Sequence, residues 1–543
     1  MFNRGYRMKT RVIYLKGKNE YFHKACVDTK CMKNAVHFYI RNTRSGLSKS
    51  PEERTHNEIE VLHNVFTGIQ AENRKREEAY KKLLAKALKT GGLLARKIII
   101  TAFKKAVPMK YPTRDKWFLN YNTLDAVFKN TKHPVYVRMS SQVNQNAIKK
   151  AVSEWQSYFD VLKEYKENPW KYKAGPKCPG YSKEEAATAW FTNQTAVLHE
   201  VNGKFVLSFI NSKNVVPVGK LTGKYIKTEV KPWCGGYRVL VTTDDASVMP
   251  EVPVNPKRIM GIDTGVDNLA AVANNYGKTP FLIKGLTVKS KNQWFNKRRA
   301  ELISCLTRGF NSTESAKTSR ALNALSRERE CYIRDYFYKA AWYIARIAAE
   351  DKVDIILIGH NRGQKDGIDT GHKNNQSFVS IPFTKFISTL KQVAAKCGIP
   401  VVDREESYTS KASFLDMDDI PVYREGENNT HTFSGKRVKR GLYVSKDGHA
   451  INADINGAAN IIRKEYPDAF KKAKDLSWLY TTTRSIGHKD LYKQSTMPKV
   501  KTTNKKKHSQ GISSRIRTRE RWRRKIDYMR FFNTGKRTYN AAA

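Results

Sequence analysis

The stretch that decides the fold reads Arg258-Ile259-Met260-Gly261-Ile262-Asp263-Thr264-Gly265. A short apolar run that ends in an acid and a glycine indicates a buried strand that closes at Asp263. A carboxylate at the end of such a strand is costly unless it binds a metal ion or a hydrogen-bond partner. Two interpretations of Asp263 therefore stay open: a metal ligand, or a turn residue whose carboxylate caps its own backbone.

Strands and helices alternate after this stretch. A hairpin comes first, and the patterns then predict a helical stretch over 291–351, a strand over 353–358, a helix over 382–397, a short strand over 399–403 and a helix over 456–464. Such alternation predicts an α/β layer architecture for this part of the chain.

A second acid, Asp454, stands where the last of these helices opens. Asp is a favoured N-cap, so capping is one interpretation. The small residues Gly457, Ala458 and Ala459 instead indicate a helix packed closely on a sheet or a ligand. Asp263 and Asp454 could meet and hold divalent ions, because a two-metal site needs carboxylates that bridge ions ~3.5–4 Å apart. Magnesium prefers oxygen ligands, and a third acid is then expected.

The half of the chain before Pro256 has a different pattern. Short alternating runs over 8–40, among them the run 36–40, predict strands. Apolar residues spaced three and four apart predict helices over 58–106 and 143–165. Alternation returns over 196–248, so a helical block is expected inside a strand-rich one.

The charge of the chain indicates its partner. The 543 residues include 100 Lys and Arg against 50 Asp and Glu, a formal net charge of +50. Such a surplus repels itself unless a polyanion neutralises it, and nucleic acid is the first candidate. No apolar run is long enough to span a bilayer, and no signal peptide is evident, so we expect a cytoplasmic protein of a prokaryotic cell, at the nucleoid when active. The seven scattered cysteines argue against a disulfide framework.

Five segments together resemble the TnpB and type V CRISPR effector family of RNA-guided nucleases. They occur in the family's order over about 256–465, and residues 175–181 add a weaker likeness in the first half. The five segments are GIDTGVDNLA at 261–270 and IILIGHN at 355–361, similar to the first and second RuvC motifs, NNQSFVSIPF at 374–383, SYTSK at 407–411, and NADINGAANI at 452–461, similar to the third motif.

The resemblance implies a multidomain α+β protein. A C-terminal RNase H-like (RuvC) α/β domain would follow a strand-rich, oligonucleotide-clamping domain that carries an inserted helical recognition lobe. The expected parts are a wedge-like domain over 1–44 and 181–255, the helical lobe over 45–180, the RuvC domain over 256–410 and 452–484, an insert over 411–451 that binds target nucleic acid, and a basic tail over 485–543.

The chain departs from the family pattern at two places. The usual glutamate of the second motif falls at Gly359, which cannot bind a metal. Another acid would have to replace it, and we predict Glu406, with Glu405 as the alternative, at the end of the next strand. The insert over 411–451 contains no cysteine, so no structural zinc ribbon is expected there.

The resemblance implies an RNA-guided DNA endonuclease. Asp263, Glu406 and Asp454 would be its catalytic residues and would hold two Mg²⁺ ions. The partners would be a guide RNA and double-stranded target DNA, as an RNA–DNA heteroduplex and a displaced strand, beside a short flanking motif; no small-molecule substrate and no membrane are expected. Gly359 keeps open a nuclease-inactive, repressor-like binder. A guide-independent transposase or resolvase, or a basic RNA-binding structural protein, would leave the ordered motifs unexplained.

Overall fold

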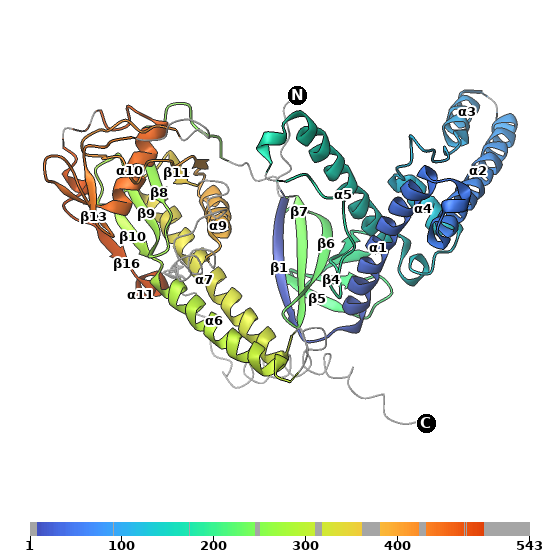
Figure 1. Ribbon diagram of the computed structural model, residues 1–543, viewed down its shortest axis with the longest axis horizontal. Coiled ribbons are helices and arrows are strands. Elements are labelled where there is room, and N and C mark those ends of the chain that lie inside the picture. Colours follow the sequence, from blue (N-terminus) through green and yellow to red (C-terminus); the bar gives the residue numbers. More distant parts are fainter. Residues whose placement is uncertain are drawn as a thin grey trace, which may run out of the picture. The chain divides into compact units, whose positions relative to one another are not determined.

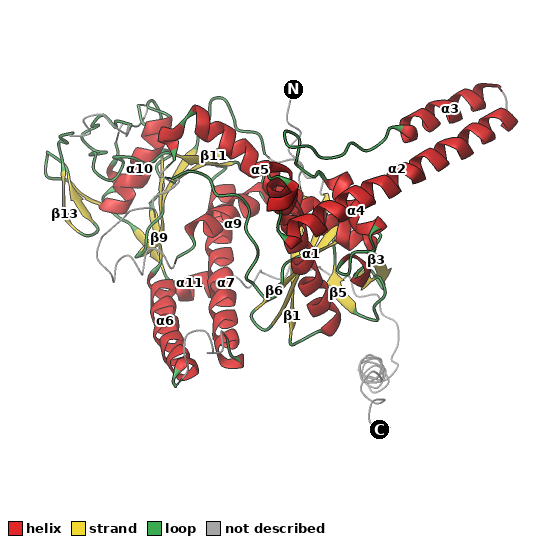
Figure 2. Cartoon of the chain, turned by 45° about the vertical axis from the view of Figure 1, so that its right-hand side comes forward, coloured by secondary structure: helices red, strands yellow, loops and turns green. Residues whose placement is uncertain are grey.

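The computed structural model describes residues 8–90, 92–172, 174–244, 250–309, 318–360, 381–422, 431–471, 473 and 475–493. Most of the expected basic tail (494–543) and most of the segment 374–383 lie outside the described residues. Figures 1 and 2 show the arrangement of the elements that follow.

Two antiparallel sheets form the strand-rich part. Strand β1 (Met8–Lys16) joins strands that lie far along the chain, in the order β1-β7-β6-β2, with β2 (Ala189–Thr192), β6 (Lys224–Trp233) and β7 (Gly236–Asp244). A second sheet has the order β3-β4-β5 and consists of β3 (Ala196–Val201), β4 (Lys204–Phe209) and β5 (Val215–Gly219). The segment between β1 and β2 is helical throughout its described elements.

The strand predicted over 36–40 is wrong. These residues belong to helix α1 (Glu20–Ser48), so the helices begin well before residue 45. Phe22, Cys26, Met32, Val36 and Ile40 are all buried, and their spacing follows the helical period. A five-residue window is too short to separate this period from strand alternation, which explains the error.

Four more helices complete the helical part. They are α2 (His56–Thr90), α3 (Gly92–Ala106), α4 (Tyr121–Asn130) and α5 (Ser141–Glu167). Figure 2 shows α2 and α3 as a two-helix projection. The core contains Val65 and Ile69 of α2, Phe128 of α4, and Ile148 and Trp155 of α5. The predicted helices over 58–106 and 143–165 are thus confirmed, the first as the two elements α2 and α3.

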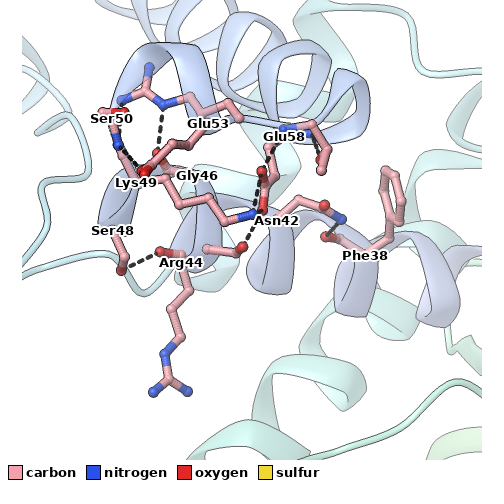
Figure 3. Close-up of polar contacts among 12 residues, drawn as sticks. Phe38, Asn42, Arg44, Gly46, Ser48, Lys49, Ser50, Glu53 and Glu58 are labelled. Carbon is pink, nitrogen blue, oxygen red and sulfur yellow. Dashed lines mark hydrogen bonds and ion pairs between the residues drawn. The ribbon is translucent and has the colours of Figure 1, made fainter.

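A buried acid joins α1 to α2. The Glu58 carboxylate accepts hydrogen bonds from Lys49 Nζ (2.8 Å), Thr55 N (2.8 Å) and the Ser45 hydroxyl. Figure 3 shows Lys49 reaching the Glu58 carboxylate at this corner. The bonds from Lys49, then Ser45, then Thr55 lower the pKa of Glu58 from 4.5 to about 2.

Glu58→Gln is expected to destabilise the helical part by about 1–3 kcal/mol at pH 7, because hydrogen bonds to a charged group are lost. A pKa below its ordinary value means that the contribution is complete above pH 4.5 and is lost as the pH falls toward 2. Urea unfolding of both proteins, at pH 7 and in steps below pH 4.5, measures this difference. Glu53→Gln, which affects an exposed residue of the same corner, is the control. A stability difference that does not shrink with falling pH would contradict the assignment.

The C-terminal part contains a six-stranded sheet in the order β12-β11-β8-β9-β10-β16. Only β9 runs opposite to the others, since β8, β10, β11, β12 and β16 are mutually parallel. The strands are β8 (Ile259–Asp263), β9 (Asn268–Asn274), β10 (Phe281–Lys284), β11 (Ile355–Gly359), β12 (Val401–Arg404) and β16 (Arg484–Ile486).

The tail predicted from residue 485 begins too early. Strand β16 pairs with β10, and the buried Ile486 belongs to the sheet edge. Helix α11 (His488–Lys493) follows it. Three residues are too few to show a period of two, so the pairing is set by long-range contact rather than by local pattern.

Helices α6 (Leu286–Thr307), α7 (Arg320–Glu350), α9 (Phe383–Lys396) and α10 (Ala453–Glu465) accompany the sheet. Helix α10 lies across β8, β9 and β11 (Figure 1). A side chain at Gly261 would collide with the Ala458 carbonyl oxygen and with Ile462. The small residues therefore let α10 approach the central strand closely.

A small sheet precedes α10. Its order is β13-β14-β15, with β13 (Lys436–Lys439), β14 (Leu442–Val444) and β15 (Ala450–Asn452). All four residues of β13 are exposed, and three of them are basic. Helix α10 begins directly after β15, so this sheet lies beside the start of that helix.

Candidate active site

Asp263 is the last residue of β8. Ile262 pairs with Ile358 of β11, so β8 and β11 end at the same level of the sheet. Burial raises the pKa of Asp263 well above 3.8, and the negative charges of Glu406 and Asp454 raise it further. Arg437 and the backbone N–H of Thr264 act in the opposite direction. The structure thus brings Asp263 near two other acids from distant parts of the chain.

Asp454 lies in the first turn of α10 but does not cap it. The cap is Asn452, whose side-chain oxygen accepts from the backbone N–H groups of Asp454 (3.0 Å) and Ile455 (3.2 Å). The capping interpretation of Asp454 is therefore wrong. Its carboxylate instead accepts a hydrogen bond from Asn268 Nδ2 (2.7 Å) and forms an ion pair with Arg437 (3.4 Å).

Glu406 fills the space that a side chain at Gly359 would need. A Cβ at position 359 would collide with the Glu406 carboxylate and lie 3.2 Å from the Glu406 Cβ. Gly359 pairs with Arg404 at the end of β12, so Glu406 lies two residues past this pair. Its carboxylate comes from the neighbouring strand into the place beside Asp263 that Gly359 leaves open.

Glu405 makes different contacts. Its carboxylate binds Lys464 Nζ (2.6 Å) and the backbone N–H of Ser407 (2.6 Å). Burial raises the pKa of Glu405, but the bonds from Lys464 and Ser407 outweigh this effect, so its pKa is lowered overall. Glu405 is not among the residues that raise the pKa of Asp263, whereas Glu406 is.

The cluster offers only carboxylate oxygens, the donors that Mg²⁺ prefers. In the described part of the chain, no three His, Cys, Asp or Glu side chains already lie in positions that would hold a metal ion. Asp454 is turned toward Asn268 and Arg437, so its side chain would have to rotate for the three carboxylates to converge on an ion. The charge of the cluster fits a cation, because burial and mutual repulsion both disfavour three ionised carboxylates without one.

Sequence reasoning did not predict the contacts that three residues make in this site. Asn268 fixes Asp454 and is itself bonded by Lys284 Nζ (3.2 Å). Arg437 reaches the cluster from β13. A Cβ at Gly457 would lie 2.9 Å from Asp263 Oδ2, so any larger residue there would require the Asp263 carboxylate to shift. All three stand inside segments already singled out, but nothing in their spacing shows which acid each one contacts.

Two further findings concern metals and membranes. The seven cysteines form no disulfide in the described residues, and none lies between residues 411 and 451. No described helix combines the length and the apolar character that a bilayer crossing requires.

Two segments that carry these residues match known families. Residues 237–364, which contain Asp263 and Gly359, match the OrfB_IS605 family, described as a probable transposase. Residues 383–461, which contain Glu406 and Asp454, match the Cas12f1-like TNB domain. One match therefore contains Asp263, and the other contains Glu406 and Asp454.

One curated relative is a TnpB-like protein, ORF457, of Acidianus two-tailed virus. The two proteins are 26% identical over 215 residues, which span 38% of this chain and 42% of the relative. The match therefore covers less than half of either protein.

Among solved structures, the chain is similar to a Cas12f1–sgRNA–target DNA complex, with 16% identity, a TM-score of 0.28, and coverage of 72% of this chain and 93% of that one. It is also similar to an AacC2c1–sgRNA binary complex, with 9% identity, a TM-score of 0.33, and coverage of 83% and 89%. Through the two family matches and the viral relative, the segments over 237–364 and 383–461 are similar to the TnpB and type V CRISPR effector proteins.

Proposed function

We propose that the protein is an RNA-guided DNA endonuclease that cuts with Asp263, Glu406 and Asp454 as its catalytic and metal-binding residues. The observation that carries this proposal is the Glu406 carboxylate, which occupies the space that Gly359 leaves empty beside Asp263. A chain that had simply lost its second-motif glutamate would need no acid at this point.

The sheet supports an RNase H-like (RuvC) assignment. Its order β10-β9-β8-β11-β12, with β9 alone reversed, places the ends of β8 and β11 side by side. Helix α10 brings Asp454 to the same edge, because it begins after β15 and crosses β8. Acids from three separated segments can therefore act at one phosphate.

The chain's own residues perform distinct tasks in this proposal. The three carboxylates would hold two Mg²⁺ ions, which when bound supply an activated water and stabilise the leaving oxygen. Asn268 donates a hydrogen bond to the Asp454 carboxylate and holds it at the side of the cluster. Arg437, on the exposed basic strand β13, lies where it would meet the DNA phosphate next to the scissile bond.

A guide RNA would supply sequence recognition in this proposal. Phosphate contacts position nucleic acid but carry no sequence information, and the net charge of +50 provides many of them. The protein would hold the RNA–DNA heteroduplex by its backbone and read only a short flanking DNA motif. It would act at the nucleoid of a prokaryotic cell.

The test is to purify the full chain with its bound RNA, sequence that RNA, and supply matching linear DNA with Mg²⁺. We expect cleavage that requires both Mg²⁺ and the RNA. Cleavage that survives RNase treatment would instead indicate a guide-independent transposase or resolvase. RNA-dependent DNA binding without any cleavage would indicate the repressor-like alternative.

A further inference from the structure

Helix α10 carries two asparagines whose side chains are fully buried, Asn456 and Asn460. The Asn460 amide donates to the backbone oxygens of Thr409 (2.9 Å) and Ala412 (2.7 Å). The Asn456 amide donates to Ala412 O (2.8 Å), and its side-chain oxygen accepts from Phe414 N (2.9 Å). Both asparagines thus bind the segment over 409–414 to the helix that bears Asp454.

The turn after Glu406 requires contacts from outside the strands to keep its conformation. Among the described residues, which stop at His360 on this side, the last backbone bond between β11 and the β12 side joins His360 N to Arg404 O (2.9 Å), and Glu406 follows two residues later. Tyr408 has φ of 61°, a left-handed conformation that is uncommon and costly for a bulky residue. Such a conformation persists only where surrounding contacts impose it.

Hydrogen bonds within the turn connect Thr409 to the backbone of Glu406. The Thr409 hydroxyl donates to the Glu406 carbonyl oxygen (2.9 Å), and the Thr409 N–H also points to that oxygen (3.3 Å). Asn460 holds the carbonyl of the same Thr409. A chain of hydrogen bonds therefore runs from α10 through Thr409 to the backbone of Glu406.

We infer that Asn460, supported by Asn456, is a positioning residue for Glu406. Helix α10 then sets all three acids: it bears Asp454, its Gly457 contacts Asp263, and its asparagines hold the turn that delivers Glu406. This fastening allows an acid outside the strand ladder to replace the one that Gly359 lacks. The inference rests on the proposed function, because it assigns a task to Glu406.

The test compares Asn460→Ala with Asn144→Ala in the full chain. Asn144 of α5 is equally buried, and its amide also donates to two backbone carbonyls, those of Tyr136 and Met139, so it reports the cost of losing a buried asparagine as such. The first readout is Mn²⁺ binding to the RNA-bound protein, followed by electron paramagnetic resonance, which requires no cleavage. The second is the Mg²⁺ concentration that gives half-maximal cleavage.

We expect Asn460→Ala to weaken Mn²⁺ binding and to raise the required Mg²⁺ concentration by about 10- to 100-fold, the range for residues that orient metal ligands. Asn144→Ala should change neither value. Wild-type values for a folded Asn460→Ala protein would overturn the inference, as would an equal loss in the Asn144→Ala protein.

A second variant covers the case in which Asn460→Ala fails to fold. Thr409→Val keeps the shape of a buried side chain and removes only the hydroxyl bond to Glu406. It should weaken Mn²⁺ binding in the same direction by a smaller factor, and unchanged binding would count against the inference.

The two proposals fail separately. If the wild-type protein binds Mn²⁺ through Asp263 but never cuts DNA, the endonuclease proposal fails, and the Mn²⁺ readout still decides the role of Asn460. If the wild-type protein cuts DNA and the folded Asn460→Ala and Thr409→Val proteins match it, only the inference about Asn460 fails.

Discussion

Asp263→Asn is expected to reduce DNA cleavage by a thousandfold or more while RNA-guided DNA binding persists. Bound ions contribute several kcal/mol to the transition state, and each ~1.36 kcal/mol is a factor of ten in rate. Asp263 is the acid on which the charges of both other acids act, so its loss should disturb every ion in the cluster. Cleavage of matched DNA and a gel-shift measurement of binding, on the same RNA-bound preparation, separate the two effects.

The same substitution should stabilise the metal-free protein. The pKa of Asp263 is raised by burial and by its acidic neighbours, so its ionised form opposes folding above its ordinary value of 3.8. The neutral amide removes this cost, and we expect a melting temperature about 2–4 °C higher at pH 7, the shift that ~1 kcal/mol produces in a domain of 150–250 residues. The gain should shrink as the pH falls through the raised pKa of the folded carboxyl and should vanish below 3.8, where the wild-type carboxyl becomes protonated in both states.

Asp267→Asn is the matched control for this prediction. Asp267 lies in the loop that follows Asp263, but its carboxylate pairs with Lys289 and Arg440 at 2.9 Å each, and Asp267 is not among the residues that shift the pKa of Asp263. Its substitution should leave cleavage within a few-fold of wild type, because partly exposed ion pairs contribute only ~0–1 kcal/mol. Normal cutting by the Asp263→Asn protein would refute the site.

Glu406→Ala is expected to lower cleavage by roughly 100- to 1,000-fold, whereas Glu405→Ala should lower it only a few-fold. Residues that merely orient metal ligands cost 10- to 100-fold, and a ligand itself should cost more. Glu405 is directed to Lys464 instead. Single-turnover cleavage rates of both variants at saturating Mg²⁺ test the contrast, and the reverse order of effects would transfer the ligand role to Glu405.

A relocation experiment extends this prediction. Gly359→Glu alone should not increase the cleavage rate and should destabilise the protein. Its side chain would collide with Glu406, and overpacking of this kind costs ~1–3 kcal/mol. In a Glu406→Gly background the space is open apart from the flexible end of Ile461, so Gly359→Glu should recover about tenfold of the lost rate or more. If the folded double variant recovers none of the cleavage rate, a carboxylate at position 359 does not replace the one at position 406.

Much of the fold follows from local patterns. The strand that ends at Asp263 and the helix that begins near Asp454 each depend on the hydrophobic period of a single segment. The same is true of α2, α3 and α5. Where the window was too short, as over 36–40 in α1 and 484–486 in β16, the local pattern misled, because only neighbours distant in sequence distinguish the alternatives.

In the site, the contrast between what the local sequence determines and what the tertiary structure determines is stronger. The residue types alone determined that acids stand at a strand end, at a helix start and after a second strand. The tertiary structure alone decided that Asn452 rather than Asp454 caps α10, and that Glu406 rather than Glu405 faces Asp263. The physical reason is that adjacent residues on an irregular turn have no period. Their directions are set by the carbonyl groups that α10 holds, and those contacts join segments about 50 residues apart.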